Sequence, residues 1–352
     1  MAEQKSFFVR RWKLILNIVT IAALVLSAWF LRKDLGDTIK NFENINAWYI
    51  LLLLPIEALN YHAQAKLYQG MFSIVGNDLS YRFLLRASVE LNFVNHVFPS
   101  GGAAGISYFG LRLKKGNEIT AAKATLIHVM KLALTFLSFE LLLAFAMIAL
   151  AVAGRVNNLM ILVGTLISTL LVVGTGVFAY VVGSKTRINS LFLAVTRLLN
   201  RVISWFKRGN PEVINLDKAR DVFDDFHDNY QELRKDLPRL KAPFWWGLVA
   251  NTTEVLAVYA VFFAFGEKVN IGAVILAYAV ANFAGLVSVL PGGVGVYEFL
   301  MTAVLATAGV SVAVSIPVIV MYRVVNTLIQ VPAGYVLYQR YLAQGGRPAN
   351  DA

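Results

Sequence analysis

Apolar segments recur along the whole chain at lengths that suit a lipid bilayer. These mainly apolar runs cover residues 14–31, 48–65, 141–152, 160–182, 244–265 and 312–338. Alone or with their flanks, they can cross roughly 30 Å of hydrocarbon as helices. A β-barrel strand would alternate apolar and polar residues, whereas these runs are apolar on every side. The pattern predicts an all-α integral membrane protein, a polytopic helical bundle.

Composition supports this fold class. Of the 352 residues, 58% are hydrophobic and 15% are charged, which is too apolar for a soluble domain with a solvated surface. The first run is longer than the apolar region of a signal peptide and is followed by Arg32 and Lys33 rather than by small residues, so we expect a retained helix. The chain has no cysteine, which excludes disulfides and thiol chemistry.

Positive charge indicates the orientation in the membrane. The net charge is +11, but lysine and arginine cluster beside the apolar runs, as the positive-inside rule expects, so no nucleic-acid partner is predicted. The largest polar stretch, 183–242, carries twelve lysine or arginine residues and should be cytoplasmic. Basic residues also flank both ends of the chain. We therefore expect a multi-pass protein of the cytoplasmic (inner) membrane with both termini cytoplasmic.

Two apolar segments contain a break that ends a helix. The breaks are Pro99-Ser-Gly101-Gly102 and Pro291-Gly292-Gly293. The basic segments all face the cytoplasm only if these two segments fail to cross. Proline stops an incoming helix and glycine permits a sharp return, as in the discontinuous helices of transporters. The sequence predicts six crossing helices and two re-entrant hairpins.

The two breaks belong to a longer internal correspondence. The matched pairs are Trp48 with Trp245, Glu57 with Glu254, Asn92 with Asn282, and Pro99 with Pro291. Nine residues separate Trp from Glu in both halves, and 32 residues separate Pro99 from Lys131 and Pro291 from Arg323. With three crossings each, two such halves lie in opposite orientations. Coincidence is the alternative, since tryptophan is common at interfaces and Pro-Gly-Gly in turns.

This correspondence divides the chain into domains. The first membrane repeat is predicted at 1–153 and the second at 158–342. A cytoplasmic insert of amphipathic helices at 184–242 interrupts the second repeat, and a cytoplasmic tail follows at 343–352.

Ionisable residues inside the apolar runs are the candidate functional residues. Each costs a few kcal/mol near the bilayer centre, which marks it as functional by default. The candidates for binding a lipid headgroup are Arg323, Lys131, Glu57, Glu254, Glu298 and Asn326, and the hairpin turns are Pro99, Gly101, Gly102, Pro291, Gly292, Gly293 and Gly295. Glu298 is placed either to pair with Arg323 or to face a cavity. The alternative is that these residues form structural pairs that lock helices together.

The pattern favours binding over catalysis. The chain contains no HExxH, no GxxxxGK[ST] phosphate loop, no GxGxxG opening a βαβ unit and no catalytic serine motif, and four histidines without cysteine predict neither a metal site nor a cofactor. The half-helix after each break begins with unpaired N–H groups, which favour a phosphate or carboxylate. We expect the bases and hairpins to hold a lipid phosphate and the glutamates a cationic headgroup. Alternatively, the glycines only turn the chain.

Several of these residues resemble a known family. The segment Pro291-Gly-Gly-Val-Gly-Val-Tyr-Glu298, the later Tyr322-Arg323, and Asn92 with Pro99-Ser-Gly-Gly are similar to the lysylphosphatidylglycerol synthase transmembrane family, which includes the flippase-like domain of the multiple peptide resistance factor. The resemblance implies translocation of an anionic or aminoacylated phospholipid, such as lysylphosphatidylglycerol, or of a polyprenyl-phosphate lipid. Bifunctional relatives attach a soluble aminoacyl-transferase domain, for which these membrane segments leave no room, so we expect translocation rather than synthesis.

Three other functions stay open. They are a lipid-headgroup transferase of the phosphatidylglycerol lysyltransferase type, an ion-coupled transporter of a small solute, and a non-transporting partner of a glycosyltransferase. The partners expected are membrane lipids, with a homo-oligomer and a lipid-modifying enzyme as further candidates.

Overall fold

The computed structural model describes residues 45–98, 103–114, 119–191, 193–194, 197, 216–287 and 295–344, and these residues form helices and connections without strands. The helices are α2 (Ala47–Leu51), α3 (Leu53–Ile74), α4 (Tyr81–Val97), α5 (Ala103–Lys114), α6 (Ala121–Val152), α7 (Asn158–Val182), α9 (Leu216–Lys235), the 3-10 helix η2 (Leu237–Leu240), α10 (Lys241–Ala264), α11 (Ile271–Val287), α12 (Val296–Thr307) and α13 (Val312–Ala343). The first apolar run, the residues after 344, and the turn residues Pro99, Gly101, Gly102, Pro291, Gly292 and Gly293 lie outside the described residues.

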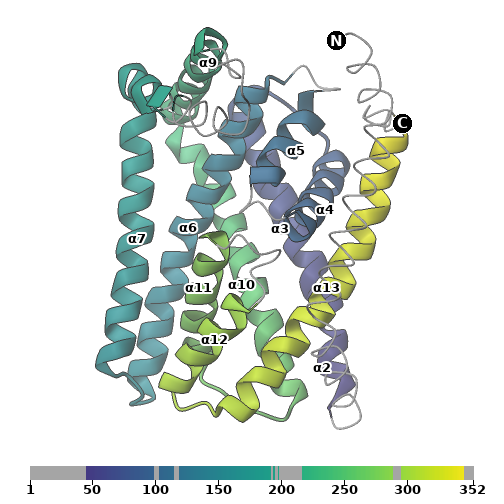
Figure 1. The fold of residues 1–352 in the computed structure, drawn as a ribbon, viewed down its shortest axis with the longest axis vertical. Helices are drawn as coiled ribbons and strands as arrows, with labels where there is room; N and C mark the ends of the chain where they lie inside the picture. Colours follow the sequence, from purple (N-terminus) through teal and green to yellow (C-terminus); the bar gives the residue numbers. More distant parts are fainter. Residues whose placement is uncertain are drawn as a thin grey trace, which may run out of the picture.

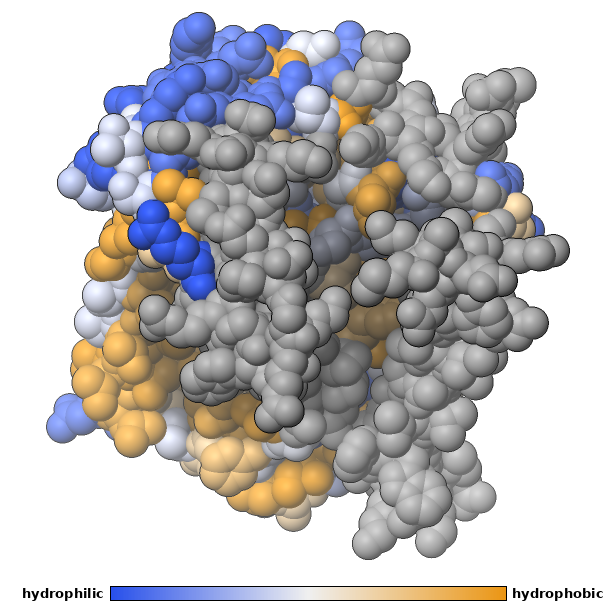
Figure 2. Space-filling view, turned by 45° about the horizontal axis from the view of Figure 1, so that its top comes forward, coloured by the Kyte–Doolittle hydropathy of each residue, from blue (hydrophilic) through white to orange (hydrophobic). Residues whose placement is uncertain are grey.

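Four described stretches are long and apolar enough to cross a membrane. They are Ala122–Val152, Asn158–Val182, Leu237–Ala264 and Val312–Ala343. Helix α7 turns a row of exposed apolar side chains outward, including Leu162, Leu166, Leu170, Val173 and Val177. In Figure 2 hydrophilic residues gather at the top of the molecule and hydrophobic residues cover the side below them. The chain is therefore a helical integral membrane protein with several apolar helices, as the sequence predicts.

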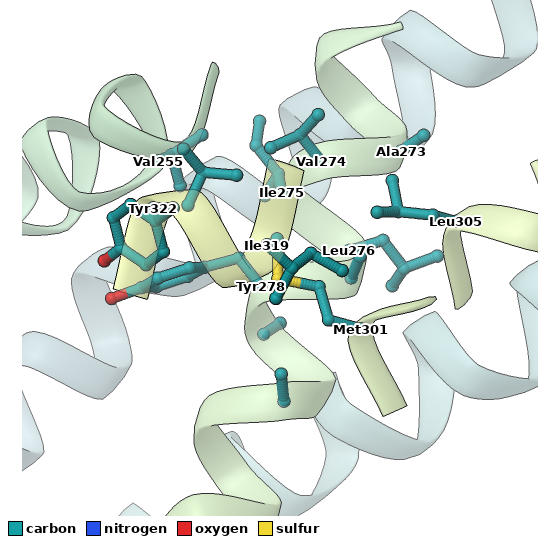
Figure 3. Packing of buried hydrophobic residues seen from close by; sticks show 14 of the residues in the cluster. Val255, Ala273, Val274, Ile275, Leu276, Tyr278, Met301, Leu305, Ile319 and Tyr322 are labelled. Atoms are coloured by element: carbon teal, nitrogen blue, oxygen red, sulfur yellow. The ribbon is translucent and has the colours of Figure 1, made fainter. Parts of the chain in front are cut away.

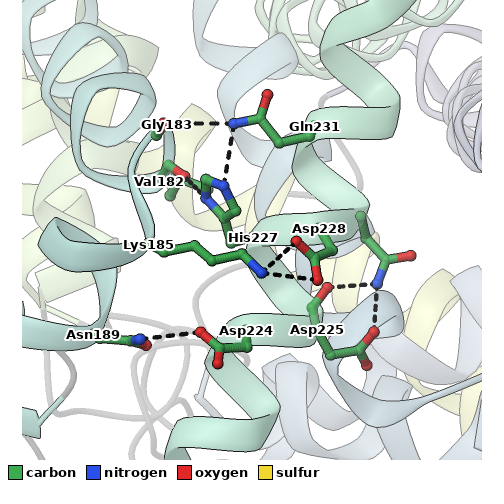
Figure 4. A network of polar contacts seen from close by, with 10 residues as sticks. Val182, Gly183, Lys185, Asn189, Asp224, Asp225, His227, Asp228 and Gln231 are labelled. Atoms are coloured by element: carbon green, nitrogen blue, oxygen red, sulfur yellow. Dashed lines mark hydrogen bonds and ion pairs between the residues drawn. The ribbon is translucent and has the colours of Figure 1, made fainter.

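Helix α9 marks one end of the bundle, here called the α9 end. His227 Nδ1 donates to the carbonyl oxygen of Val182 over 2.7 Å, and Lys185 pairs with Asp228 at 2.8 Å (Figure 4). The hydrogen bond to Asp228 raises the pKa of the Lys185 ammonium above its ordinary value. Thr120 donates to Asp225 over 2.7 Å. The last turn of α7 and the start of α6 therefore meet α9 at the same end.

The α6–α7 turn marks the opposite end. Asn270 Nδ2, just before α11, donates to the carbonyl oxygen of Ala149 over 3.1 Å, and Asn157 Nδ2 donates to that of Thr307, at the end of α12, over 2.9 Å. Helices α11 and α12 thus leave and return at the α6–α7 end. The pair α4 and α5 does the same at the α9 end, because Lys123 Nζ, at the start of α6, donates to the carbonyl oxygen of Val75 over 3.3 Å.

The two halves match helix by helix. Counted over the residues that the structure describes, α4 and α11 each have 17 residues, α5 and α12 each have 12, and α6 and α13 each have 32. The turns that precede α4 and α11 also agree, with φ of 75° at Gly76 and 74° at Gly266. In both turns the N–H after this glycine donates to a phenylalanine carbonyl over 3.0 Å. Such a left-handed glycine is a usual way to end a helix.

These turns change which residues correspond. Glu254 lies 12 residues before Gly266, and Gln64 lies 12 residues before Gly76, so Glu254 aligns with Gln64 rather than with Glu57. The pairing of Glu57 with Glu254, predicted from tryptophan spacing, differs from this count by seven residues, about two helical turns, and stays a prediction. The reason is local: Trp48 lies in the short separate helix α2, so its spacing to Glu57 crosses a helix boundary.

The largest apolar cluster joins α10, α11, α12 and α13 (Figure 3). Leu276 of α11, Met301 of α12 and Ile319 of α13 are almost fully buried in it. Within lipid this packing stabilises the bundle by close contact rather than by removing surface from water. The rings of Tyr278 and Tyr322 belong to the same cluster, and Figure 3 shows their hydroxyl oxygens side by side at its edge. The cluster thus fixes two hydroxyl groups where the polar interior begins.

A close helix crossing gives a stability prediction. A methyl group on Gly334 of α13 would lie 2.3 Å from Phe93 Cβ of α4. We expect Gly334→Ala to destabilise the protein by about 1–3 kcal/mol through overpacking, measured as a lower Tm in detergent. The control is Gly174→Ala on α7, where a methyl group meets nothing within 4 Å and the Tm should hold or rise. An unchanged Tm for Gly334→Ala would contradict this crossing.

Candidate functional site

Two neighbouring cavities lie inside the bundle. The arginine cavity, of about 250 Å³, is lined by Asn92, His96, Glu254, Tyr278, Asn282, Tyr297, Tyr322, Arg323, Asn326, Thr327 and Gln330. The lysine cavity, of about 350 Å³, is lined by Asn60, Gln64, Asn92, Asn95, Lys131, Thr135, Phe136, Phe139, Ala250, Asn251, Glu254, Tyr278, Ala279, Asn282 and Phe283. Asn92, Glu254, Tyr278 and Asn282 line both. The cavities therefore meet at one shared wall that carries a carboxylate.

An ion pair dominates the arginine cavity. Arg323 of α13 pairs with Glu298 of α12, and its guanidinium carbon lies 5.1 Å from the centre of the Tyr297 ring. The second oxygen of Glu298 accepts from the N–H of Gly295 over 2.7 Å. Gly295 has φ of 86°, a conformation that glycine adopts without strain. Glu298 itself thus supplies an anion at the N-terminus of α12, where the sequence suggested a ligand anion.

A relay of two hydrogen-bonded amides connects Lys131 to Glu254. Lys131 Nζ of α6 donates to Gln64 Oε1 over 3.4 Å, and Gln64 Nε2 donates to Asn60 Oδ1 over 2.6 Å. Asn60 Nδ2 in turn donates to Glu254 Oε1 over 3.3 Å. Lysine and glutamate, at opposite ends of the relay, both line the lysine cavity. This cavity therefore offers one group of each charge to a ligand.

Glu254 is the central acid of the site. It lies on α10 and lines both cavities, and its second oxygen accepts from the Tyr322 hydroxyl over 3.1 Å. Nearby, Asn326 Nδ2 donates to the same hydroxyl over 3.5 Å. Within the described part of the chain, the Oδ1 atom of Asn326 and the hydroxyl of Tyr297 are buried without a hydrogen-bond partner. Buried polar atoms without partners are costly, so these two groups have capacity for a ligand or water.

Glu57 lies beside the two cavities, and its expected role in binding a headgroup stays a prediction. Its side chain is 3% exposed, and one carboxylate oxygen accepts from Gln330 Nε2 over 2.6 Å. Glu57 lines neither the arginine nor the lysine cavity, whereas Gln330 lines the arginine cavity. Glu57 therefore lies behind the cavity wall and orients an amide that faces the cavity.

The structure brings most of the candidate residues together. Arg323, Lys131, Glu254 and Asn326 line the cavities, and Glu298 binds Arg323. Asn60 and Gln64, which form the relay from α3, are not among the residues predicted from the sequence. A signal was available, because two amides four residues apart within an apolar run lie on one helix face. Polar residues in such a run are costly in lipid and point toward the bundle interior.

Comparison with known proteins covers nearly the whole chain. Residues 14–334 match the model of a family described as the lysylphosphatidylglycerol synthase TM region. The chain is similar to a UPF0104 membrane protein of Pyrococcus horikoshii, with 21% identity over 92% of this chain and 96% of that protein. It is also similar to a UPF0104 membrane protein of Methanothermobacter thermautotrophicus, with 22% identity over 85% of both chains.

Proposed function

Because the chain belongs to the lysylphosphatidylglycerol synthase transmembrane family, we propose that it is a lipid translocase of the flippase type. Its substrate is an anionic or aminoacylated phospholipid of the lysylphosphatidylglycerol kind, or a polyprenyl-phosphate lipid, moved across the cytoplasmic membrane. The observation that carries this proposal is the pair of cavities, lined in part by charged and amide side chains, that meet at Glu254 inside an apolar bundle. Charged groups at such positions mark pathways for polar substrates.

The charges suggest how a headgroup is held. Arg323 and Lys131, one in each cavity, donate hydrogen bonds to the phosphate, and Glu254 between them accepts hydrogen bonds from a cationic amine. Asn326 Oδ1 and the Tyr297 hydroxyl supply polar atoms that make no hydrogen bond to any described residue. Because Glu298 already pairs with Arg323, it tunes the charge of the arginine cavity rather than forming its own site. An aminoacylated lipid, with both a phosphate and amines, would use groups of both signs.

The proposed mechanism is alternating exposure of this site. In the proposal, two re-entrant hairpins enter the membrane from opposite faces: α4 with α5, and α11 with α12. They belong to inverted repeats at 1–153 and 158–342. Matched helix lengths and the return of each pair to its own end support this arrangement. Inverted repeats commonly place the substrate site at the repeat interface near the bilayer midplane. Movement of one hairpin against the other would open the cavities to either face.

The same proposal states which helices cross the membrane and which parts of the chain face the cytoplasm. Six helices cross, namely the run at 14–31 together with α3, α6, α7, α10 and α13. The α9 end, which includes the basic insert at 184–242, faces the cytoplasm together with both termini and the tail at 343–352. Partners beyond membrane lipids, namely a second copy of the chain or a lipid-modifying enzyme, remain part of the proposal.

The absence of cysteine gives a direct topology test. We expect single cysteines at Asp78 and Glu232, which belong to the α9 end, to be shielded from an impermeant maleimide in intact cells. A cysteine at Lys268, at the α6–α7 end, should be labelled. Lysed cells provide the control, in which all three should react. Labelling of Asp78→Cys and Lys268→Cys from the same side would contradict the proposed crossing number.

Function and substrate can be tested together in reconstituted liposomes. Lysylphosphatidylglycerol and polyprenyl-phosphate probes are offered separately, and the probe that changes leaflet names the lipid class. Movement of neither probe would remove the proposal. A parallel reaction of the purified protein with lysyl-tRNA and phosphatidylglycerol tests the transferase alternative, since formation of lysyl-lipid would replace translocation with synthesis.

A further inference from the structure

A second buried charge cluster lies apart from the two central cavities, where α4 and α5 meet the last turns of α13. Arg112 Nε of α5 donates to Glu90 Oε2 of α4 over 2.8 Å, and the two side chains are 6% and 2% exposed. Tyr108 donates its hydroxyl to the same oxygen over 2.6 Å. One glutamate oxygen therefore receives two donors and holds the arginine from one side only.

The rest of the Arg112 guanidinium is held in place by aromatic rings that do not satisfy its hydrogen-bonding capacity. Its central carbon lies 4.7 Å from the centre of the Phe83 ring and 4.6 Å from that of Tyr341. Its Nη1 atom is buried and has no hydrogen-bond partner among the residues that the structure describes. A buried charged donor without an acceptor is costly, because it gives up its bonds to water and gains none in return. The orientation of Arg112 thus leaves one donor group available to an acceptor.

A cavity of about 200 Å³ lies at this point. Its lining includes Arg112, Glu90, Tyr341 and Gln344, with the exposed residues Arg86 and Arg340. Three arginines face one glutamate, so the lining carries an excess of positive charge. None of the residues lining this cavity lines the arginine or the lysine cavity. Its chemistry is therefore separate from that of the proposed translocation site.

We propose that this cavity binds a phosphate group, with Arg112 as the buried donor and Arg86 and Arg340 at its rim. Guanidinium groups match the geometry of phosphate oxygens and retain their charge when buried. The cluster belongs to the α9 end, among the basic segments of the chain, where anionic headgroups would gather. The phosphate belongs either to an anionic lipid headgroup or to a soluble phosphate compound. By binding α5 and α13 at once, it would hold the first hairpin against the helix that carries Arg323.

The test uses the purified full-length chain in two arms. In one arm, binding of inorganic phosphate is measured in detergent by equilibrium dialysis. In the other, the protein is placed in phosphatidylcholine nanodiscs with or without phosphatidylglycerol, and retained phosphatidylglycerol is measured after extraction. Binding in the first arm supports a soluble phosphate compound, and retention in the second alone supports a lipid. The absence of both would overturn the proposal.

Variants connect binding to this cavity. Arg340→Gln, at the exposed rim, should weaken binding about fivefold or more, and Arg112→Lys, which keeps a charge beside Glu90, should weaken it about tenfold. The matched control is Arg239→Gln, since Arg239 is an exposed arginine that pairs with Asp236 three residues away. Its binding should equal that of wild type. If Arg340→Gln and Arg112→Lys both fold with the wild-type Tm and bind as wild type does, the cluster is only a structural pair that fixes the hairpin.

Discussion

Methionine in place of Arg323 is expected to slow lipid movement by about tenfold or more, because a hydrogen-bonded charge contributes roughly 1.5–3 kcal/mol. Arg323 is the guanidinium of the arginine cavity, where it contacts Glu298 and the face of Tyr297. Methionine keeps most of the side-chain volume and removes the charge. The measurement is the initial rate of leaflet exchange in liposomes at equal protein content.

Two controls separate binding from folding. Arg155→Met removes an exposed arginine that donates to the carbonyl oxygen of Ala308 at the α6–α7 end, far in the fold from the cavities, and should leave the rate unchanged. Arg323→Met alone leaves the partly buried Glu298 without its cation, which is destabilising in itself. The double variant with Glu298→Gln removes both charges and should recover the Tm without recovering transport. Wild-type rates in Arg323→Met would remove the arginine cavity from the pathway.

The second large effect is a contrast between two acids inside the bundle, the buried Glu57 and the partly buried Glu254. Glu254→Gln is expected to reduce the movement of an aminoacylated lipid about tenfold or more, because it removes the one carboxylate that lines both cavities. Glu57→Gln should reduce it by less than about threefold, since glutamine still accepts the hydrogen bond from Gln330 and an uncharged pair loses little. Both variants are isosteric, so each serves as the packing control for the other.

The choice of lipid should change the size of the Glu254→Gln effect. The amines of lysylphosphatidylglycerol require an acid, whereas a polyprenyl phosphate carries no cation for Glu254 to bind. The loss in Glu254→Gln should therefore be larger for the aminoacylated lipid than for the phosphate lipid. Equal losses in Glu57→Gln and Glu254→Gln would contradict the distinction between a residue behind the wall and one in the cavity.

Much of the architecture could be predicted from the sequence, because a helix that crosses lipid must be long and apolar. Long apolar runs predicted the helical membrane fold, and the chemistry of the interior singled out Arg323, Lys131 and Glu254, which do line the cavities. The pairing of Glu298 with Arg323 was one of two predicted arrangements and is the one present. Both residues follow the break at Pro291, so their spacing within one half of the chain was enough to suggest the pair.

The remaining features depended on contacts between distant segments. Asn60 donates to the carbonyl oxygen of Ala250, 190 residues away, and no spacing along α3 indicates that partner. Glu57 and Glu254 are both acids in apolar runs, yet only the packing of α13 decides that one meets Gln330 and the other faces a cavity. Depth in the membrane identifies candidates, while the direction of a side chain comes from its neighbours.

The most direct measurement of the central claim is leaflet-selective labelling of lysylphosphatidylglycerol in liposomes that contain the purified chain. A membrane-impermeant amine reagent is added outside, and the labelled share of the lipid is followed over time. We predict that the wild-type protein makes the inner-leaflet lipid available, so that labelling continues past the outer-leaflet share seen in protein-free liposomes. If labelling stops at that share for this lipid, and a polyprenyl phosphate probe likewise stays in its original leaflet, the protein is not a lipid translocase.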